Sequence, residues 1–92
     1  MSRVLAAVAD GAEAQGLQVR VQSSNLCAVY YQPDFARLFV WFGGTEKTPR
    51  LTRYAYDGVE PAVYAALLAA PSKGQFLDQK LKKAGYGYAG PF

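Results

Sequence analysis

The spacing of apolar and polar residues changes several times along the chain, and each change marks a predicted element. Residues 2–15 have the period of a helix, which Ser2 can cap and Gly16 can end in a left-handed conformation. The apolar side chains that fall near one face of this helix are Val4, Leu5, Val8 and Ala12. Residues 17–22 alternate with period two, which predicts a strand whose inward side chains are Leu17, Val19 and Val21.

The middle of the chain contains the clearest strands. Residues 26–31 are apolar, β-branched and aromatic, and the pattern leaves open whether they continue the strand at 17–22 or form a second one. Residues 37–42 alternate with large apolar groups on both faces. One face carries Leu38, Val40 and Phe42, and the other carries Arg37, Phe39 and Trp41. One of these faces must meet the core, and the other must be covered or used for binding.

Turn-forming residues separate the strands. Pro33-Asp34 is a turn signature between the second and third strands. A loop at residues 43–49 precedes another strand at residues 50–56. Because short strands at this spacing are joined by short, turn-rich loops, we predict an antiparallel meander.

Two helices are predicted after the strands. Residues 60–70 have an apolar stripe at helical spacing, with Pro61 in the first turn, where its missing N–H costs nothing, and Pro71 as the stop. The second helix runs from Ser72 to Ala84, and it begins with SKGQ, which has the spacing of a capping box.

These elements predict one α+β domain, with a three- to four-stranded antiparallel β-meander packed with two C-terminal helices, plus an N-terminal helix. Residues 1–22 form an N-terminal helix-and-strand extension, residues 23–84 form the main body, and residues 85–92 form a Gly/Tyr-rich tail. We expect this tail, GYGYAGPF, to be flexible unless its rings dock on the domain.

Composition narrows the classes of function. The chain has no histidine, which excludes histidine-dependent bases, triads and zinc motifs. Its one cysteine, Cys27, lies in an apolar strand and is expected to be a small core residue, and its seven carboxylates form no telling pair. We therefore expect a protein that is not an enzyme and that uses no cofactor and no metal.

Charge and hydropathy point to a protein without a membrane partner. The net charge is +3, which permits a polyanion as partner. No apolar run approaches the length of a membrane span. A single cysteine allows no internal disulfide and fits a reducing compartment, so we expect the protein to be cytoplasmic.

About two-thirds of the chain, from Ser23 to about Ala84, resembles the KTSC domain, a small module found at the carboxyl end of some lysyl-tRNA synthetases and as stand-alone bacterial and phage proteins. The residues that carry the resemblance occur in the expected order: Ser23-Ser24-Asn25-Leu26, Ala28-Val29-Tyr30-Tyr31, Leu38-x-Val40-x-Phe42, Tyr54-x-Tyr56, Gly58-Val59-x-Pro61-x-Val63-Tyr64-x-x-Leu67 and Ala70-Pro71-Ser72-Lys73-Gly74-x-Phe76.

The resemblance implies a compact β-meander with two helices and a nucleic-acid role, RNA in particular, and it carries no catalytic site. The chain departs from the family's usual pattern in three places. Residues 1–22 lie outside the domain, the loop at 43–49 is longer than a tight turn, and the tail is not strongly basic. Each departure is a place where a specialised partner could be accommodated.

The leading hypothesis is a non-catalytic nucleic-acid-binding accessory domain that favours RNA. Paired tyrosines on a sheet face can stack bases, and lysines at helix ends can neutralise phosphates. The same residues have ordinary explanations as core rings, a helix cap and solvated cations. The candidate residues are Arg53, Tyr54 and Tyr56 on the sheet, Lys73 and Gly74 at the start of the second helix, and Lys80, Lys82 and Lys83 near its end.

The alternative hypothesis is a protein-interaction module of a bacterial or phage protein that docks on a larger complex. Large aromatic side chains are the usual anchors of such interfaces, and here they are Tyr30, Tyr31, Phe39 and Trp41. The N-terminal helix could then support homo-oligomer formation. Under this alternative, Trp41→Ala abolishes capture of the partner and leaves the fold intact.

Overall fold

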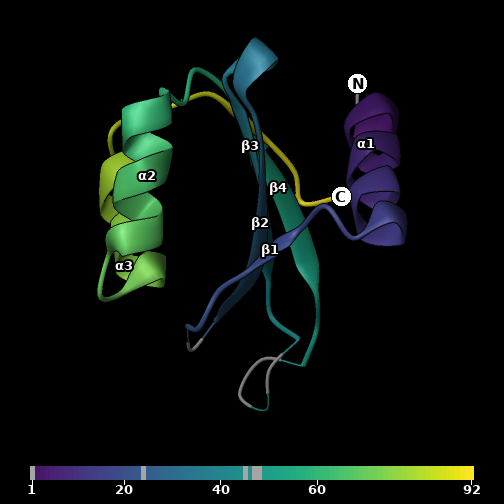
Figure 1. Cartoon of the computed structure of the whole chain (residues 1–92), viewed down its shortest axis with the longest axis horizontal. Coiled ribbons are helices and arrows are strands. Elements are labelled where there is room, and N and C mark those ends of the chain that lie inside the picture. Colours follow the sequence, from purple (N-terminus) through teal and green to yellow (C-terminus); the bar gives the residue numbers. More distant parts are fainter. Residues whose placement is uncertain (1, 24, 45, 47–48) are drawn as a thin grey trace.

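A five-stranded antiparallel sheet with helices on both faces forms the described part of the chain, which comprises residues 2–23, 25–44, 46 and 49–92 of a computed structural model (Figure 1). The strand order follows the chain order. The strands are β1 (Val19–Arg20), β2 (Leu26–Gln32), β3 (Arg37–Phe42), β4 (Thr52–Tyr56) and β5 (Tyr88–Ala89). A 3-10 turn, η1 (Pro33–Phe35), connects β2 to β3.

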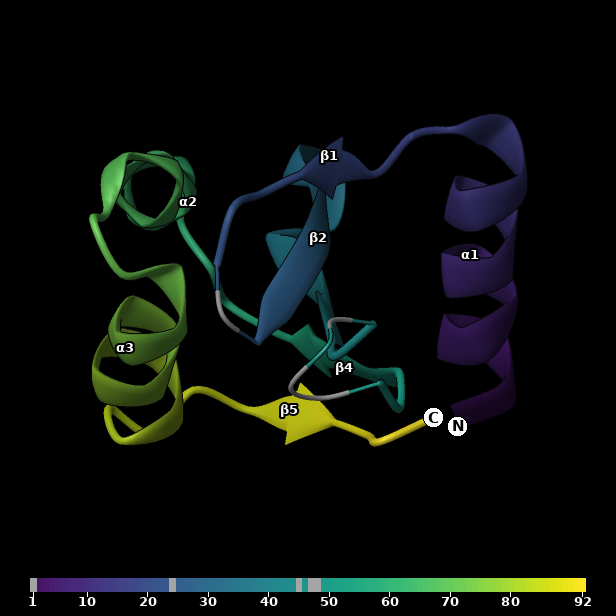
Figure 2. The same cartoon turned by 90° about the horizontal axis from the view of Figure 1, so that it is seen from below.

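The helices lie on opposite sides of this sheet. Helix α1 (Ser2–Gln15) covers one face, while α2 (Pro61–Ala69) and α3 (Lys73–Leu77) cover the other (Figures 1 and 2). Helix α3 continues directly into a π-helical segment, η2 (Asp78–Lys82). The predicted α+β fold, with a meander, two C-terminal helices and an N-terminal helix, is confirmed.

The tail is part of the sheet and does not stand apart from it. Tyr88 pairs with Tyr56 at the edge of β4, so the tail supplies the fifth strand. Its last ring also docks, because Phe92 lies edge-on to Phe39 with 6.5 Å between ring centroids. The prediction of three to four strands therefore undercounted the sheet. Docking of this kind depends on tertiary contacts, and a short Gly-rich segment carries no local signal that predicts them.

Helix α1 ends as its sequence predicts. Gly16 has a φ of +67°, and the N–H groups of Gly16 and Leu17 donate to the carbonyls of Glu13 and Ala12, which is a Schellman arrangement. The inward face agrees with the prediction at Leu5, Val8 and Ala12, but Val4 is 68% exposed and the buried Ala9 was not predicted. The side chain of Ser2, the predicted cap, lies outside the described part of the structure.

The first predicted strand is shorter than its alternating pattern. Only Val19 and Arg20 pair with β2, as a separate strand at the sheet edge. Leu17 and Val19 are exposed, contrary to the prediction, whereas Val21 packs against the hydrophobic core as predicted. Of the predicted loop at 43–49, residues 45, 47 and 48 lie outside the described part.

Strand β3 separates two hydrophobic cores. Because successive side chains of a strand point to opposite faces, Leu38 and Val40 pack toward α2 and α3, while Phe39 and Trp41 pack toward α1. The larger core contains Leu26, Val29, Leu38, Val40, Tyr56, Val59, Leu67, Leu77 and Leu81. The smaller core contains Ala9, Ala12, Ala28, Phe39, Trp41 and Ala55.

Burial of the smaller core overturns one prediction. Phe39 and Trp41 are each 1% exposed, so the expectation that they form an exposed interaction surface is wrong. The indole N–H of Trp41 donates to Glu13 at 2.5 Å, which ties the ring to α1. Helix α1, which was expected to be an extension outside the domain, covers the face that these two aromatic rings would otherwise expose.

Arg53 on β4 links the sheet to helix α1 and to the tail. Its guanidinium pairs with Asp10 at 2.5 Å and with Glu13 at 3.3 Å, both on α1. Its Nε donates to the carbonyl oxygen of Phe92 at 3.0 Å, and the Phe92 N–H donates to the Arg53 carbonyl at 3.0 Å. The hydrogen bond to Asp10 is the largest influence that raises the pKa of Arg53. One side chain thus joins α1, β4 and the tail.

We expect Trp41→Ala to lower the free energy of unfolding by about 3–5 kcal/mol, because it removes a buried ring and leaves a cavity under α1. Urea denaturation followed by far-ultraviolet circular dichroism measures this loss. Leu17→Ala is the matched control, since its side chain is 45% exposed and its loss should be within about 0.5 kcal/mol. A Trp41 variant as stable as the control would mean that the ring is not core.

Candidate functional site

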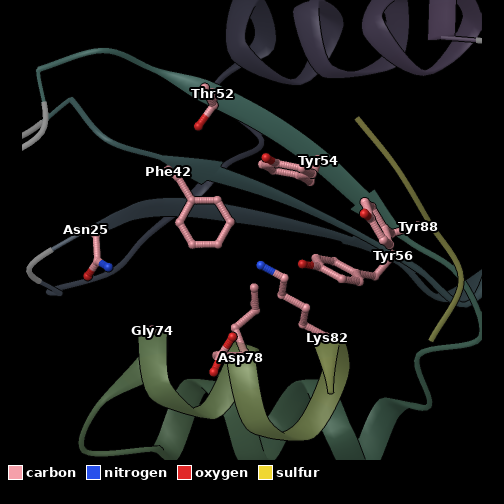
Figure 3. Close-up of a pocket in the computed structure, with 10 residues that line it drawn as sticks. Asn25, Phe42, Thr52, Tyr54, Tyr56, Gly74, Asp78, Lys82 and Tyr88 are labelled. Atoms are coloured by element: carbon pink, nitrogen blue, oxygen red, sulfur yellow. The ribbon is translucent and has the colours of Figure 1, made fainter. Parts of the chain in front are cut away.

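A cleft of about 390 Å³ lies between the sheet and the α3–η2 segment (Figure 3). Strands β3, β4 and β5 provide one wall, and the start of α3 together with η2 provides the other. The residues that line it are Asn25, Phe42, Thr52, Tyr54, Tyr56, Gly74, Leu77, Asp78, Lys82 and Tyr88.

The sheet wall of the cleft is aromatic. Alternation along β4 places Tyr54 and Tyr56 on the same face, and the β3–β4 pairing brings Phe42 beside Tyr54, with 5.7 Å between ring centroids. Tyr88 on β5 lies 6.1 Å from Tyr54 and 5.8 Å from Tyr56. Four rings therefore line one side of the cleft, and Tyr56 is held most firmly because it is 4% exposed.

The helical wall carries the charged groups. Leu77 and Leu81 are buried in the larger core, so the residue that follows each of them, Asp78 and Lys82, lies on the flank next to the sheet. The Lys82 side chain reaches toward the rings of Phe42 and Tyr56 (Figure 3). Asp78 pairs with Lys83 at 3.3 Å, whereas Lys82 makes no ion pair or hydrogen bond with other described residues.

The tyrosine hydroxyls also converge on the cleft. Those of Tyr54, Tyr56 and Tyr88 form no hydrogen bond with another residue in the described part of the chain. Burial raises the pKa of Tyr56 above its ordinary value, and the nearby phenols and the Asp78 carboxylate raise this pKa further. The cleft thus combines aromatic surface with phenolic donors and one ammonium group that have no partner among the described residues.

Gly74 brings the start of α3 close to the end of the cleft. A Cβ atom at this position would lie 3.2 Å from the Oδ1 of Asn25, which is closer than most such contacts. The Ser72 hydroxyl accepts a hydrogen bond from the Gln75 N–H at 3.4 Å, which confirms the predicted cap of this helix. A small residue at position 74 is therefore explained by the approach to Asn25.

A second cavity, of about 290 Å³, lies at the other face of the sheet and is bordered by Glu13, Gln18, Arg20, Cys27, Trp41 and Leu51. Burial raises the pKa of the Cys27 thiol. Glu13 in this cavity already accepts from the Trp41 indole and the Arg53 guanidinium. Because its carboxylate is occupied in this way, this cavity offers less to a ligand than the aromatic cleft.

Comparison with known proteins identifies the family. The KTSC domain matches residues 22–86, which is more than half of the chain. The chain belongs to the KTSC domain family. A crystal structure of a KTSC domain protein from Yersinia pestis has a TM-score of 0.62 and 28% sequence identity, and the match covers 78% of this chain and 92% of that one. Among curated proteins, none matches the chain significantly.

The cleft lies almost entirely within the KTSC domain. Of the residues that line it, only Tyr88 falls outside the matched range of 22–86. Helix α1 precedes that range. In this chain the domain thus supplies the cleft, and the flanking segments contribute one ring to it and cover the opposite face of the sheet.

Four of the residues predicted for nucleic-acid binding meet in this cleft, namely Tyr54, Tyr56, Gly74 and Lys82. The other four lie elsewhere. Arg53 is on the opposite face and pairs with α1, as the alternation of β4 requires. The Lys73 ammonium donates to the Ala70 carbonyl at 3.0 Å, Lys80 is exposed outside the lining, and Lys83 pairs with Asp78.

Sequence reasoning missed Asn25, Phe42, Thr52, Asp78 and Tyr88. Alternation along neighbouring strands could have placed Phe42 with the tyrosine face. The spacing of Asp78 and Lys82, four residues apart on one helix, could also have paired them. Nothing local places Tyr88, because its position depends on the tail joining the sheet.

Metal-binding clusters and membrane-spanning helices are both absent from the described part of the chain. It contains no group of three or more histidine, cysteine, aspartate or glutamate side chains arranged to hold a metal ion. None of its helices has the length and apolar character needed to cross a membrane.

We expect Tyr56→Phe to reduce the alkaline sensitivity of the fold. The pKa of Tyr56 is raised in the folded state, so the unfolded chain loses the phenolic proton at a lower pH than the folded protein does. The stabilisation that the protonated phenol contributes is therefore complete below a pH of about 10 and is lost as the pH rises. Urea midpoints measured from about pH 8 to pH 11 should fall less steeply for Tyr56→Phe than for the native protein. Tyr86→Phe, whose hydroxyl lies outside the cleft, is the control; equal slopes for all three proteins would contradict the assignment.

Proposed function

We propose that this KTSC domain protein is a non-catalytic nucleic-acid-binding accessory domain that favours RNA, and that the aromatic cleft holds one unstacked nucleotide. The observation that carries the proposal is the convergence of three phenolic hydroxyls and the Lys82 ammonium, without partners among the described residues, on a cleft walled by four rings. Such a surface suits a ligand with both a planar ring and an anion.

The rings support the base-binding part of the proposal. Aromatic side chains bind unstacked bases, and each base stacked on a ring contributes about 1–3 kcal/mol. The volume of about 390 Å³ lies within the range of small-molecule sites, about 300–1,000 Å³. A duplex cannot present an isolated base to a cleft of this size, which favours single-stranded segments, the usual targets of specific RNA recognition.

The donors support the phosphate-binding part. An ammonium and phenolic O–H groups supply hydrogen atoms to phosphate oxygens, and Lys82 needs to break no ion pair within the described residues to do so. Exposed Lys80 lies on the same segment and adds positive potential near the cleft without touching a nucleotide inside it. Binding is therefore expected to combine one fixed contact with a more diffuse attraction.

A binding role fits this lining better than catalysis. Asp78 is the one carboxylate among the residues that line the cleft, and the chain has no histidine to act beside it as a general acid or base. Cys27 lies at the other cavity, on the opposite face of the sheet. The cleft can hold and orient a nucleotide with the groups that it presents.

The protein-interaction alternative has less support. Its proposed anchors Phe39 and Trp41 are core residues. Tyr31 and Tyr64 are stacked with 4.6 Å between ring centroids, and the Tyr31 hydroxyl donates to the Val59 carbonyl at 2.5 Å. Tyr30 is half-buried and packs against the smaller core. None of these rings is presented as a free anchor.

We expect the protein to bind single-stranded RNA more weakly as salt rises from about 50 mM to about 200 mM, because phosphate contacts release counterions. Fluorescence anisotropy with labelled mixed-sequence RNA and DNA oligonucleotides measures this. Lys82→Ala should weaken binding across sequences and lower the salt slope by about one, as expected for the loss of one phosphate contact. The triple replacement of Lys80, Lys82 and Lys83 by Ala should lower it further.

Lys80→Ala is the matched control, since it removes the same charge from the same segment but lies outside the cleft. Its effect should be clearly smaller than that of Lys82→Ala. Equal effects of the two variants would show that the attraction is diffuse and would remove the cleft from the proposal. No binding of any oligonucleotide at the lower salt concentration would overturn the nucleic-acid function itself.

A further inference from the structure

We infer that Phe92 is a positioning residue for the cleft: it holds β5 against β4 and thereby places the Tyr88 ring beside the other rings of the aromatic wall. The inference rests on the proposed function, because it names what fixes one wall of the nucleotide-binding cleft. Phe92 itself packs against the smaller core, on the other face of the sheet. The affinity of the cleft thus depends on the face that α1 covers.

The contacts of Tyr88 itself are too few to fix its position. Tyr88 is 56% exposed, and β5 consists of two residues that pair with the end of β4. Segments with so few buried contacts open locally at little cost. On the amino-terminal side, Tyr86 packs against the larger core and its N–H donates to the Leu81 carbonyl. The other end of β5 needs an anchor of its own.

Phe92 provides this anchor with both its main chain and its ring. Its N–H donates to the Arg53 carbonyl at 3.0 Å, and its main-chain oxygen accepts from the Arg53 Nε at 3.0 Å. The ring lies edge-on to the buried Phe39, and the guanidinium carbon of Arg53 lies 5.7 Å from the ring centroid. The tail reaches this place by crossing from the side of α3 to the side of α1 (Figure 2).

Gly90 allows the segment between Tyr88 and Phe92 to lie directly on β4. A Cβ atom at this position would lie 2.7 Å from the Arg53 carbonyl oxygen and 2.9 Å from the Cδ2 of Tyr54. The φ of Gly90 is +129°, which a residue with a side chain rarely adopts. The tail therefore passes against Tyr54, a second ring of the cleft, on its way to the anchor.

Helix α1 completes the anchor through Arg53. The guanidinium that contacts Phe92 is also held by Asp10 at 2.5 Å and by Glu13 at 3.3 Å. Both α1 and Phe92 lie outside residues 22–86, the range that matches the KTSC domain. The two flanking segments thus meet at one arginine of the domain, and through Tyr88 they reach its cleft.

The Asp57 amide reports on the tail without any ligand, because its N–H donates to the Gly87 carbonyl at 2.8 Å, next to Tyr88. Hydrogen exchange followed by nuclear magnetic resonance should be at least about ten-fold faster at Asp57 in Phe92→Ala than in the native protein. Phe35→Ala is the matched control, since it removes the same kind of ring from η1, where it is 64% exposed. It should leave the exchange at Asp57 unchanged.

RNA binding tests the consequence for the cleft. In fluorescence anisotropy at low salt, Tyr88→Ala should weaken binding of single-stranded RNA about five-fold, which corresponds to the low end of the range for one stacked base. Phe92→Ala should weaken binding by a similar factor and leave the salt slope unchanged, because no charge is lost. The double variant should bind no more weakly than Tyr88→Ala alone, as expected when one residue acts through the other.

Two further variants separate the anchor from a general loss of stability. Phe92→Leu keeps an apolar side chain against Phe39 and should retain most of the affinity. Gly90→Ala keeps the Phe92 ring but pushes the tail away from β4, so it should weaken binding as Phe92→Ala does. Circular dichroism confirms that each variant is folded.

The outcomes separate this inference from the proposed function. Unchanged exchange at Asp57 in Phe92→Ala would overturn the inference. Additive losses of affinity in the double variant would also overturn it, because Phe92 would then not act through Tyr88. Failure of the native protein to bind any oligonucleotide would overturn the proposed function, and the Asp57 amide would still decide whether Phe92 holds β5 in place.

Discussion

The burial of β3 on both faces is the constraint on which the rest of the structure depends. A strand whose residues 38–42 are all large and apolar needs a cover on each side, because neither face can be left to water without cost. Helices α2 and α3 cover Leu38 and Val40, while α1 covers Phe39 and Trp41. For a chain of 92 residues, a second covered face adds core that a sheet with helices on one face lacks.

The two faces of β3 are covered in different ways. On the α1 side, Ala9 and Ala12 are small enough for the helix to lie close over the rings, and Arg53 joins the helix to the sheet through carboxylates. On the other side, the leucines of α3 and η2 enter the core and leave Asp78 and Lys82 beside the sheet. The cleft lies at the margin of this core, where Tyr56 is still buried while Tyr54 and Tyr88 beside it are not.

Much of the fold was predictable because its elements have strong local signals. The alternation in β3, Pro61 and Pro71 around α2 and Gly16 after α1 each act within a few residues. What the sequence did not reveal depends on contacts between distant segments. The pairing of Tyr88 with Tyr56 made the tail a strand, and the docking of α1 turned Trp41 from a proposed anchor into core. The same holds for the candidate site. Alternation along β4 predicts that Tyr54 and Tyr56 share one face, whereas Asp78 lies in the same cleft only because of tertiary packing.

The fold also separates the two ends of the described chain from the cleft. Ser2 and Phe92 both lie on the α1 side of the sheet, and the α3–η2 wall of the cleft lies on the other side (Figures 1 and 2). A label, a tether to a surface or a second protein joined at either end therefore projects away from the aromatic rings. The domain can in this way be carried by a larger assembly with its cleft still open to solvent.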